Sequence, residues 1–249
     1  MGVSENGCHL CAPLVAKTTE DMREQMHFAH SQGADIVELR LDHISHFNPP
    51  VDLPLLLKDR PLPAIVTYRP TWEGGEYVGA EDARLDALRL AMNLGADFID
   101  VELKAAPGFI ANLQDRKSNG CKILVSNHNF ETTPSAEAIG ALVAKIVSCG
   151  ADIVKFVTTA QKITDVANVF QILARCQVTF NCLVFPFAAR LPQQAPSVNF
   201  GGVLEFHISL VNAAPRVTLH RDLLRLADLV LVFISPTAGS YPNASSTTA

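Results

Sequence analysis

The chain has 249 residues, of which 48% are hydrophobic and 18% charged, and its formal net charge is -5. This composition predicts one domain over residues 1–234 and a disordered tail over residues 235–249, which is rich in Ser, Thr, Gly and Pro. The acidic balance offers no basic face for nucleic acid, and no apolar run reaches the roughly 18 residues of a membrane span. We therefore expect small-molecule or protein partners, with no nucleic acid and no membrane.

Strands and helices alternate along the chain. The expected strands are residues 10–16, 35–41, 64–69, 98–103, 122–127, 152–157, 179–185 and, more weakly, 202–206. One amphipathic helix begins with a capping box of Thr18 and Asp21, and a later one begins at the Thr133-Pro134 pair. Eight alternating units favour an α/β fold, the (β/α)8 TIM barrel, over an open doubly wound sheet.

Three similar phrases, at residues 33–38, 95–100 and 150–155, mark junctions between a helix and the next strand. Each reads as a glycine at a helix C-terminus, a short turn and a buried strand. The third phrase alone ends in a lysine, Lys155, within an otherwise apolar strand. A buried lysine in such a strand suggests chemistry, because its charge is costly to desolvate.

Side-chain alternation along the strands sorts the polar residues by face. Glu38, Arg40 and Asp42 share one face of their strand, and the apolar residues between them share the other. The same rule sends polar side chains of four further strands to the barrel interior: Thr67, Arg69, Asp100, Glu102, Ser126, His128 and Lys155. This pattern favours a functional site; the structural alternative is a set of interior salt bridges in which Arg40 and Arg69 only pair with Glu38 and Asp100.

A lysine and a histidine on neighbouring strands about 4.8 Å apart can converge on one substrate carbon. Burial and a nearby arginine favour the neutral amine of Lys155, which can attack a ketone or aldehyde and form a Schiff base. The iminium acidifies the adjacent C–H, and His128 can remove that proton and later protonate a leaving hydroxyl. These residues predict an imine-based lyase, either a dehydratase or an aldolase.

Two short motifs invite a metal interpretation. Cys8 and Cys11 form a CxxC without a second ligand pair, and His43 and His46 form an HxxH without a third ligand. We therefore expect no metal site. The six scattered cysteines predict buried thiols without disulfides.

Four segments carry a resemblance to a known family: ELRLD at residues 38–42, TYR at 67–69 with EGGE at 73–76, SNHNF at 126–130 and VK at 154–155. In order and spacing they resemble the type I 3-dehydroquinate dehydratases, in particular the dehydratase half of the plant bifunctional dehydroquinate dehydratase/shikimate dehydrogenases. The likeness covers roughly residues 8–178.

This resemblance implies the conversion of 3-dehydroquinate to 3-dehydroshikimate in the shikimate pathway, without a metal or organic cofactor. Lys155 would form the Schiff base with the C3 ketone, and His128 would take the C2 proton and deliver one to the departing C1 hydroxyl. Glu73 would orient the histidine. The substrate's hydroxyls and the polar end of the pocket would be held by Glu38, Arg40 and Arg69.

Beyond about Val178 the sequence departs from the family pattern, so the last barrel units are expected to be degraded or atypical. Arg190 is the candidate for the arginine that binds the substrate carboxylate, and residues 213–217 replace a Ser-Ala-Pro-Gly-Gln lid. Three functions remain open: an active dehydratase, another class I aldolase-type imine-forming lyase, and a catalytically impaired homologue with an altered substrate lid.

The N-terminal residues lack the hydrophobic core of a signal peptide and the Arg/Ser bias of a transit peptide. A cytoplasmic protein is expected from the chain as given, whereas the plant relatives indicate a plastid if a transit peptide precedes it. For assembly, a homodimer is an open alternative.

Overall fold

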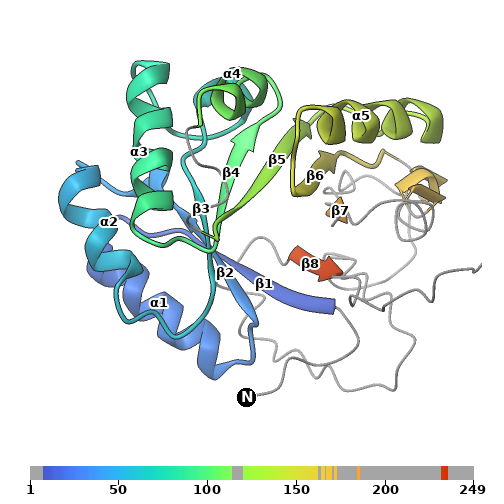
Figure 1. Ribbon diagram of the computed structural model, residues 1–249. Coiled ribbons are helices and arrows are strands. Elements are labelled where there is room, and N and C mark those ends of the chain that lie inside the picture. The colour runs from blue at the N-terminus through green and yellow to red at the C-terminus, as the bar shows by residue number, and fades with distance from the viewer. Residues whose placement is uncertain are drawn as a thin grey trace, which may run out of the picture.

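The computed structural model describes residues 8–113, 120–161, 164–165, 167–169, 171–172, 184–185 and 231–234 (Figure 1). The strands are β1 (Cys8–Leu14), β2 (Ile36–Arg40), β3 (Ala64–Thr67), β4 (Phe98–Glu102), β5 (Lys122–Asn129), β6 (Ile153–Thr158), β7 (Val184–Phe185) and β8 (Leu231–Ile234). The helices are α1 (Thr19–Ser31), α2 (Pro49–Leu57), α3 (Glu81–Asn93), α4 (Ala106–Ala111) and α5 (Ala136–Ser148), with the short 3-10 helices η1 (Leu41–His43) and η2 (Thr71–Glu73).

The strands form one sheet in the order β7-β6-β5-β4-β3-β2-β1-β8. All pairs from β1 to β7 are parallel. Strands β1 to β6 curl into a half-barrel, and the helices lie along its outer side (Figure 1). The α/β class and the TIM-barrel-like architecture are therefore confirmed.

The last part of the sheet departs from a regular barrel. Strand β8 pairs antiparallel with β1, with Cys8 opposite Ile234, whereas a regular (β/α)8 barrel is parallel throughout. The prediction of a strand over residues 202–206 lies outside the described residues, as do residues 179–183 of the seventh predicted strand and the predicted tail over 235–249. Within the part of the chain that is described, no helix is long and apolar enough to cross a membrane.

The repeated junctions have the predicted geometry. Gly33, Gly95 and Gly150 have φ values of 89°, 84° and 88°, in the left-handed region that glycine enters without strain. At the start of α1, the Thr18 hydroxyl accepts a hydrogen bond from the backbone N–H of Asp21 at 3.1 Å. Both features confirm the predicted boundaries.

The start of α5 differs from the prediction. Its N-cap is Ser135, whose hydroxyl accepts from the backbone N–H of Ala138 at 3.3 Å. The hydroxyl of Thr133 instead donates to Thr158 at the end of β6, at 3.0 Å. The predicted cap at Thr133 is therefore wrong, because a tertiary contact uses its side chain.

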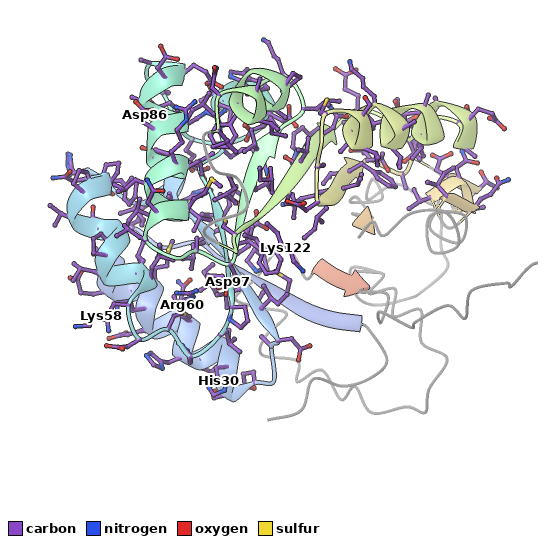
Figure 2. The ribbon with its side chains drawn as sticks, viewed as in Figure 1. His30, Lys58, Arg60, Asp86, Asp97 and Lys122 are labelled. Atoms are coloured by element: carbon purple, nitrogen blue, oxygen red, sulfur yellow. The ribbon has the colours of Figure 1, made fainter. Side chains whose placement is uncertain are left out.

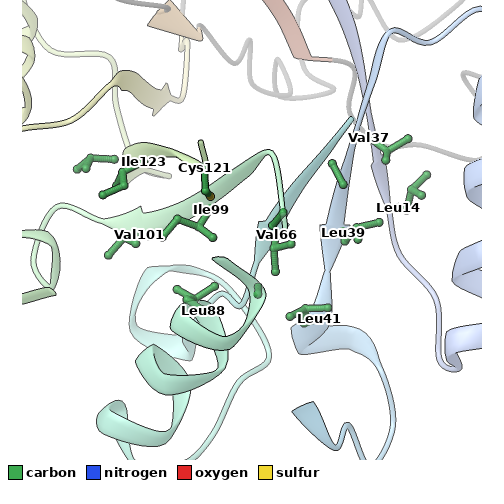
Figure 3. Packing of buried hydrophobic residues seen from close by; sticks show 14 of the residues in the cluster. Leu14, Val37, Leu39, Leu41, Val66, Leu88, Ile99, Val101, Cys121 and Ile123 are labelled. Carbon is green, nitrogen blue, oxygen red and sulfur yellow. The ribbon is translucent and has the colours of Figure 1, made fainter. Parts of the chain in front are cut away.

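The main core lies between the sheet and the helices. In Figure 3, Val66, Ile99 and Val101 of the sheet and Leu88 of α3 lie in one apolar layer. Near the amino ends of the strands, Asp97 accepts hydrogen bonds from the Arg60 guanidinium at 2.6 and 3.1 Å (Figure 2). The apolar layer packs against the outer face of the sheet, and a second, smaller cluster lies on its inner face.

Candidate active site

The inner face of the half-barrel changes from apolar to polar along each strand. Its apolar floor consists of Cys11, Ile36, Ile65, Leu124 and Ile153, with the partly buried Phe98 of β4 packed against them. Two residues further along five strands, a polar side chain is buried at each interior position: Glu38, Thr67, Asp100, Ser126 and Lys155. Because a pleated strand repeats every two residues, the polar layer lies directly above the floor. The predicted interior placement of these residues is confirmed.

Lys155 lies between two carboxylates in this layer. Its Nζ donates to Glu38 Oε1 and to Asp100 Oδ2, each at 3.0 Å, and the lysine is 2% exposed. Glu38 Oε1 also accepts from the Thr67 hydroxyl at 2.7 Å. The amine is thus fixed at a single position inside the barrel.

Arg69 forms the second cationic centre. Its Nη2 donates to Asp100 at 2.6 Å, and its Nη1 donates to Glu102 and to the Ser126 hydroxyl, both at 2.7 Å. Burial alone would raise the pKa of Asp100, but Arg69 and Lys155 outweigh it and hold that pKa well below its ordinary value. Burial would likewise lower the pKa of Arg69, yet Asp100 and Glu102 raise it. Both groups are therefore charged at neutral pH.

A third buried cation, Arg84, reaches the same network from helix α3. Its Nη1 lies 2.7 Å from Glu102 Oε2, as an ion pair without hydrogen-bond alignment, and donates to the carbonyl of Tyr68 at 2.9 Å. Burial raises the pKa of Glu102, and Arg69 and Arg84 offset this effect only in part. Arg84 therefore links the helix layer to the polar interior.

His128 and Glu73 form a pair at the end of β5. Glu73 Oε1 accepts from the backbone N–H of His128 and contacts its Nδ1, both at 3.0 Å. Burial raises the pKa of Glu73 to about 7. Burial also lowers the pKa of His128 well below 6.5, and Arg69 and Lys155 lower it further. When Nδ1 donates to the carboxylate, Nε2 keeps its lone pair and can act as a base.

Asp42 anchors the loop that carries Glu73. Its two oxygens accept a bidentate pair of hydrogen bonds from the Arg40 guanidinium, at 3.0 and 2.8 Å. They also accept hydrogen bonds from the backbone N–H groups of Arg69 and Glu76. Burial would raise the pKa of Asp42, but the bonds from Arg40 lower it. This carboxylate ties the end of β2 to both ends of the loop.

The structure brings together most of the predicted site residues: Glu38, Arg69, Glu73, His128 and Lys155. The side chain of Arg40 is 20% exposed and pairs with Asp42 rather than with Glu38. Arg190 and residues 213–217 lie outside the described residues. In the HxxH motif, His43 contacts Asp42 at 3.5 Å and Glu76 at 3.1 Å.

Sequence reasoning missed the part that Arg84 plays. A signal was present, since Arg84 shares a helical stripe with Leu88 and Ala91, all of them fully buried. A charged residue on such a stripe indicates a buried partner. The anchoring role of Asp42 was also missed, because it depends on backbone groups far away in the sequence.

Comparisons with known proteins agree with this geometry. The family model for type I 3-dehydroquinase matches residues 10–185. The chloroplastic bifunctional 3-dehydroquinate dehydratase/shikimate dehydrogenase of Arabidopsis thaliana is 45% identical over 227 residues, which cover 90% of this chain and 37% of that relative. The 3-dehydroquinate dehydratase of Methanocaldococcus jannaschii is 33% identical over 165 residues, which cover 66% of this chain and 72% of that protein.

Among solved structures, the 3-dehydroquinate dehydratase of Enterococcus faecalis matches with a TM-score of 0.65 and 26% identity, covering 76% of this chain and 82% of that one. The type I 3-dehydroquinate dehydratase of Clostridium difficile has the same fold, with a TM-score of 0.65 at 22% identity and coverage of 75% and 78%. The chain spans only 37% of the length of the Arabidopsis relative. The family match over residues 10–185 shows that this chain belongs to the type I 3-dehydroquinase family.

Proposed function

We propose that the protein is a 3-dehydroquinate dehydratase that acts through a Schiff base on Lys155. One observation carries the proposal: a buried lysine lies one strand away from a histidine–glutamate pair whose side chains are 10% and 8% exposed. In the β5–β6 register Lys155 is opposite Ser126, so His128 is two residues closer to the carboxyl end. The lysine and the base can therefore face adjacent carbons of one substrate.

Imine formation begins with loss of a proton from Lys155. Two carboxylates lie 3.0 Å from its Nζ, but Asp100 is a weak proton acceptor because Arg69 and Lys155 hold its pKa low. Glu38 is the remaining acceptor at that distance. The freed amine attacks the C3 ketone, and loss of water from the adduct gives the iminium.

The elimination uses the His128–Glu73 pair. Nε2 of His128 removes the C2 proton, and the electrons of that C–H bond move toward the iminium nitrogen to give an enamine. The electrons then return and expel the C1 hydroxyl, which leaves as water with a proton from His128. Hydrolysis of the product imine restores Lys155, so the net reaction is the loss of one water from 3-dehydroquinate.

Arg40 and Arg69 suit the polar end of the substrate, and we assign them to binding. Arg190 stays a proposal for the substrate carboxylate, because an arginine guanidinium matches a carboxylate in two bonds. Neither role requires a metal ion or an organic cofactor.

Borohydride trapping tests the proposal. Purified protein is mixed with 3-dehydroquinate and reduced, its intact mass and peptide masses are measured, and formation of 3-dehydroshikimate is followed in parallel. We expect an adduct on Lys155 and turnover of the substrate. Lys155→Met should lose both signals, whereas His128→Ala should keep the adduct and lose turnover. Lys122→Met, at an exposed lysine of β5, is the matched control (Figure 2).

The other outcomes separate the competing functions. An adduct without turnover would identify an impaired homologue, and the masses would show whether the trapped species has lost water. Trapping of a different keto substrate, with cleavage of a carbon–carbon bond, would identify an aldolase. A folded protein that gives neither adduct nor product contradicts the proposal.

Compartment and assembly are separate proposals. The Arabidopsis relative is named as chloroplastic; we propose a cytoplasmic location for this protein, with a plastid location as the alternative that this relative favours. Fluorescent fusions in plant cells distinguish them. The proposed homodimer is tested by sedimentation of the purified protein over a range of concentrations.

A further inference from the structure

The ring of Phe130 covers the imidazole of His128. The two rings are stacked, with centroids 5.7 Å apart and planes inclined by 17°. Phe130 follows β5 directly, and 54% of it is exposed to solvent. An aromatic ring in this position separates the imidazole from water on one side.

Gly74 also lies against the ring of Phe130. A Cβ at Gly74 would lie 2.5 Å from Cε2 of Phe130, so the phenyl ring lies directly against this glycine. Gly74 has a φ of 78° and follows Glu73 in the chain. The loop that supplies the carboxylate therefore also supplies the surface against which Phe130 packs.

We propose that Phe130 is a positioning residue for His128: its ring, packed against Gly74, holds the imidazole against Glu73 and shields their hydrogen bond from water. The hydrogen bond from Nδ1 to Glu73 Oε1 fixes which nitrogen is the base, so its loss would misplace the lone pair of Nε2. The kinetic consequence rests on the proposed dehydratase function, whereas the protection of the hydrogen bond does not.

Charged groups act on the imidazole from several other elements. They are Glu73 of η2, Arg69 beyond β3, Asp100 of β4, Lys155 of β6 and Arg40 of β2. Of these, Arg69, Arg40, Lys155 and Asp100 act through charge, which changes the cost of protonation but does not fix the plane of the ring. Phe130 contacts the ring face and can fix its orientation.

Nuclear magnetic resonance of protein labelled with 15N-histidine tests the positioning directly. The chain contains 8 histidines, and the His128 signal is identified by its absence from His128→Gln. We expect a His128 Nδ1–H signal that exchanges slowly with water in the natural protein and at least about tenfold faster in Phe130→Ala. Phe130→Tyr keeps the ring and should keep the slow exchange. Phe28→Ala removes another partly exposed phenylalanine, on α1, and is the control.

Kinetics supply the second measurement. Phe130→Ala should lower kcat at least about tenfold and leave KM within about twofold, because a displaced base slows proton transfer more than it weakens substrate binding. Phe130→Tyr should restore kcat. If the natural protein does not turn over 3-dehydroquinate, the proposed function fails, yet the exchange measurement still tests the positioning.

Gly74→Ala provides a second test from the loop that carries Glu73. The new Cβ meets the ring of Phe130, and a residue other than glycine is strained at this φ, so this variant should also expose the His128 Nδ1–H. Equal exchange rates in the natural protein, Phe130→Ala and Phe28→Ala, with folding verified by circular dichroism, would overturn the proposal.

Discussion

Glu73 holds His128 twice through one oxygen: the backbone N–H and the Nδ1 of the histidine each lie 3.0 Å from Oε1. The carboxylate therefore fixes both the end of β5 and the tautomer of the base. Its burial raises the pKa from an ordinary 4.5 to about 7, and Arg69 opposes this rise only in part. The pair is thus poised to hold or release a proton near neutral pH.

This pKa makes Glu73 a source of pH-dependent stability. Since the folded protein binds the proton more tightly than the unfolded chain, the stabilisation is present below about pH 4.5 and is lost as the pH rises through about 7. As an order of magnitude, the loss is about 3 kcal/mol. Glu73→Gln removes it, so the variant should gain stability relative to the natural protein between about pH 5 and pH 8.

Urea unfolding at a series of pH values measures this difference in the free energy of unfolding. Glu131→Gln, at an exposed loop position just after Phe130, is the matched control and should give a constant difference across the series. A constant difference for Glu73→Gln as well would contradict the assignment of a raised pKa to this carboxyl.

Lys155 neutralises a buried pair of carboxylates, and its removal should be costly. Lys155→Met leaves Glu38 without its ammonium partner, and we expect a loss of about 3–5 kcal/mol in unfolding free energy together with the loss of imine formation. Adding Glu38→Gln should restore part of the stability and none of the chemistry. Lys122→Met should change stability by less than about 0.5 kcal/mol, since that lysine is exposed.

Denaturant unfolding and borohydride trapping on the same four proteins check the prediction. If the double variant is less stable than Lys155→Met, the buried charge of Glu38 is not the cause of the loss.

The polar interior could be predicted from the sequence because a strand has a strict period of two. Glu38, Asp100 and Lys155 are the last residues of the three repeated phrases, and each lies on the inner face in the structure. Alternation does not decide which partner a side chain chooses. Arg40 is the last residue of β2, with a φ of -85° and a ψ of 84°, and its side chain pairs with Asp42 of η1 and not with Glu38.

Contacts between distant segments could not be predicted in the same way. Thr133 and Ser135 both carry hydroxyls that can cap a helix. In the structure Thr133 donates to Thr158 of β6, and Ser135 begins α5. Glu73 lies in η2, outside the strands, so the two-residue alternation of a strand could not place it beside His128. The family resemblance supplied that pairing, and alternation of side chains could not have done so.

Arg84 should be more important for stability than its place on a helix suggests. Arg84→Met leaves Glu102 with Arg69 as its remaining ion-pair partner in a site without solvent, and we expect a loss of about 3–5 kcal/mol in unfolding free energy. Arg89→Met on the same helix breaks a pair with Asp86 that is largely exposed, and should cost less than about 1 kcal/mol (Figure 2).

Thermal and urea unfolding of both variants measure the contrast. Adding Glu102→Gln should restore stability to Arg84→Met and not to Arg89→Met. Equal losses for the two arginine variants would show that the ion pair with Glu102 contributes little.

Gly75 is required by close packing of the loop that carries Glu73. A Cβ there would lie 2.1 Å from the carbonyl oxygen of Arg69, which accepts a hydrogen bond from the backbone N–H of Tyr77. Gly75→Ala must therefore shift the loop, and we expect a loss of about 1–3 kcal/mol in unfolding free energy and reduced turnover.

Gly108 in α4 is the matched control, because a Cβ there meets no atom within 4 Å. Gly108→Ala should stabilise the protein by about 0.5–1 kcal/mol through helix propensity and leave turnover unchanged. Parallel unfolding and activity measurements decide the point: an active, fully stable Gly75→Ala would mean that the loop can move without displacing Glu73 from His128.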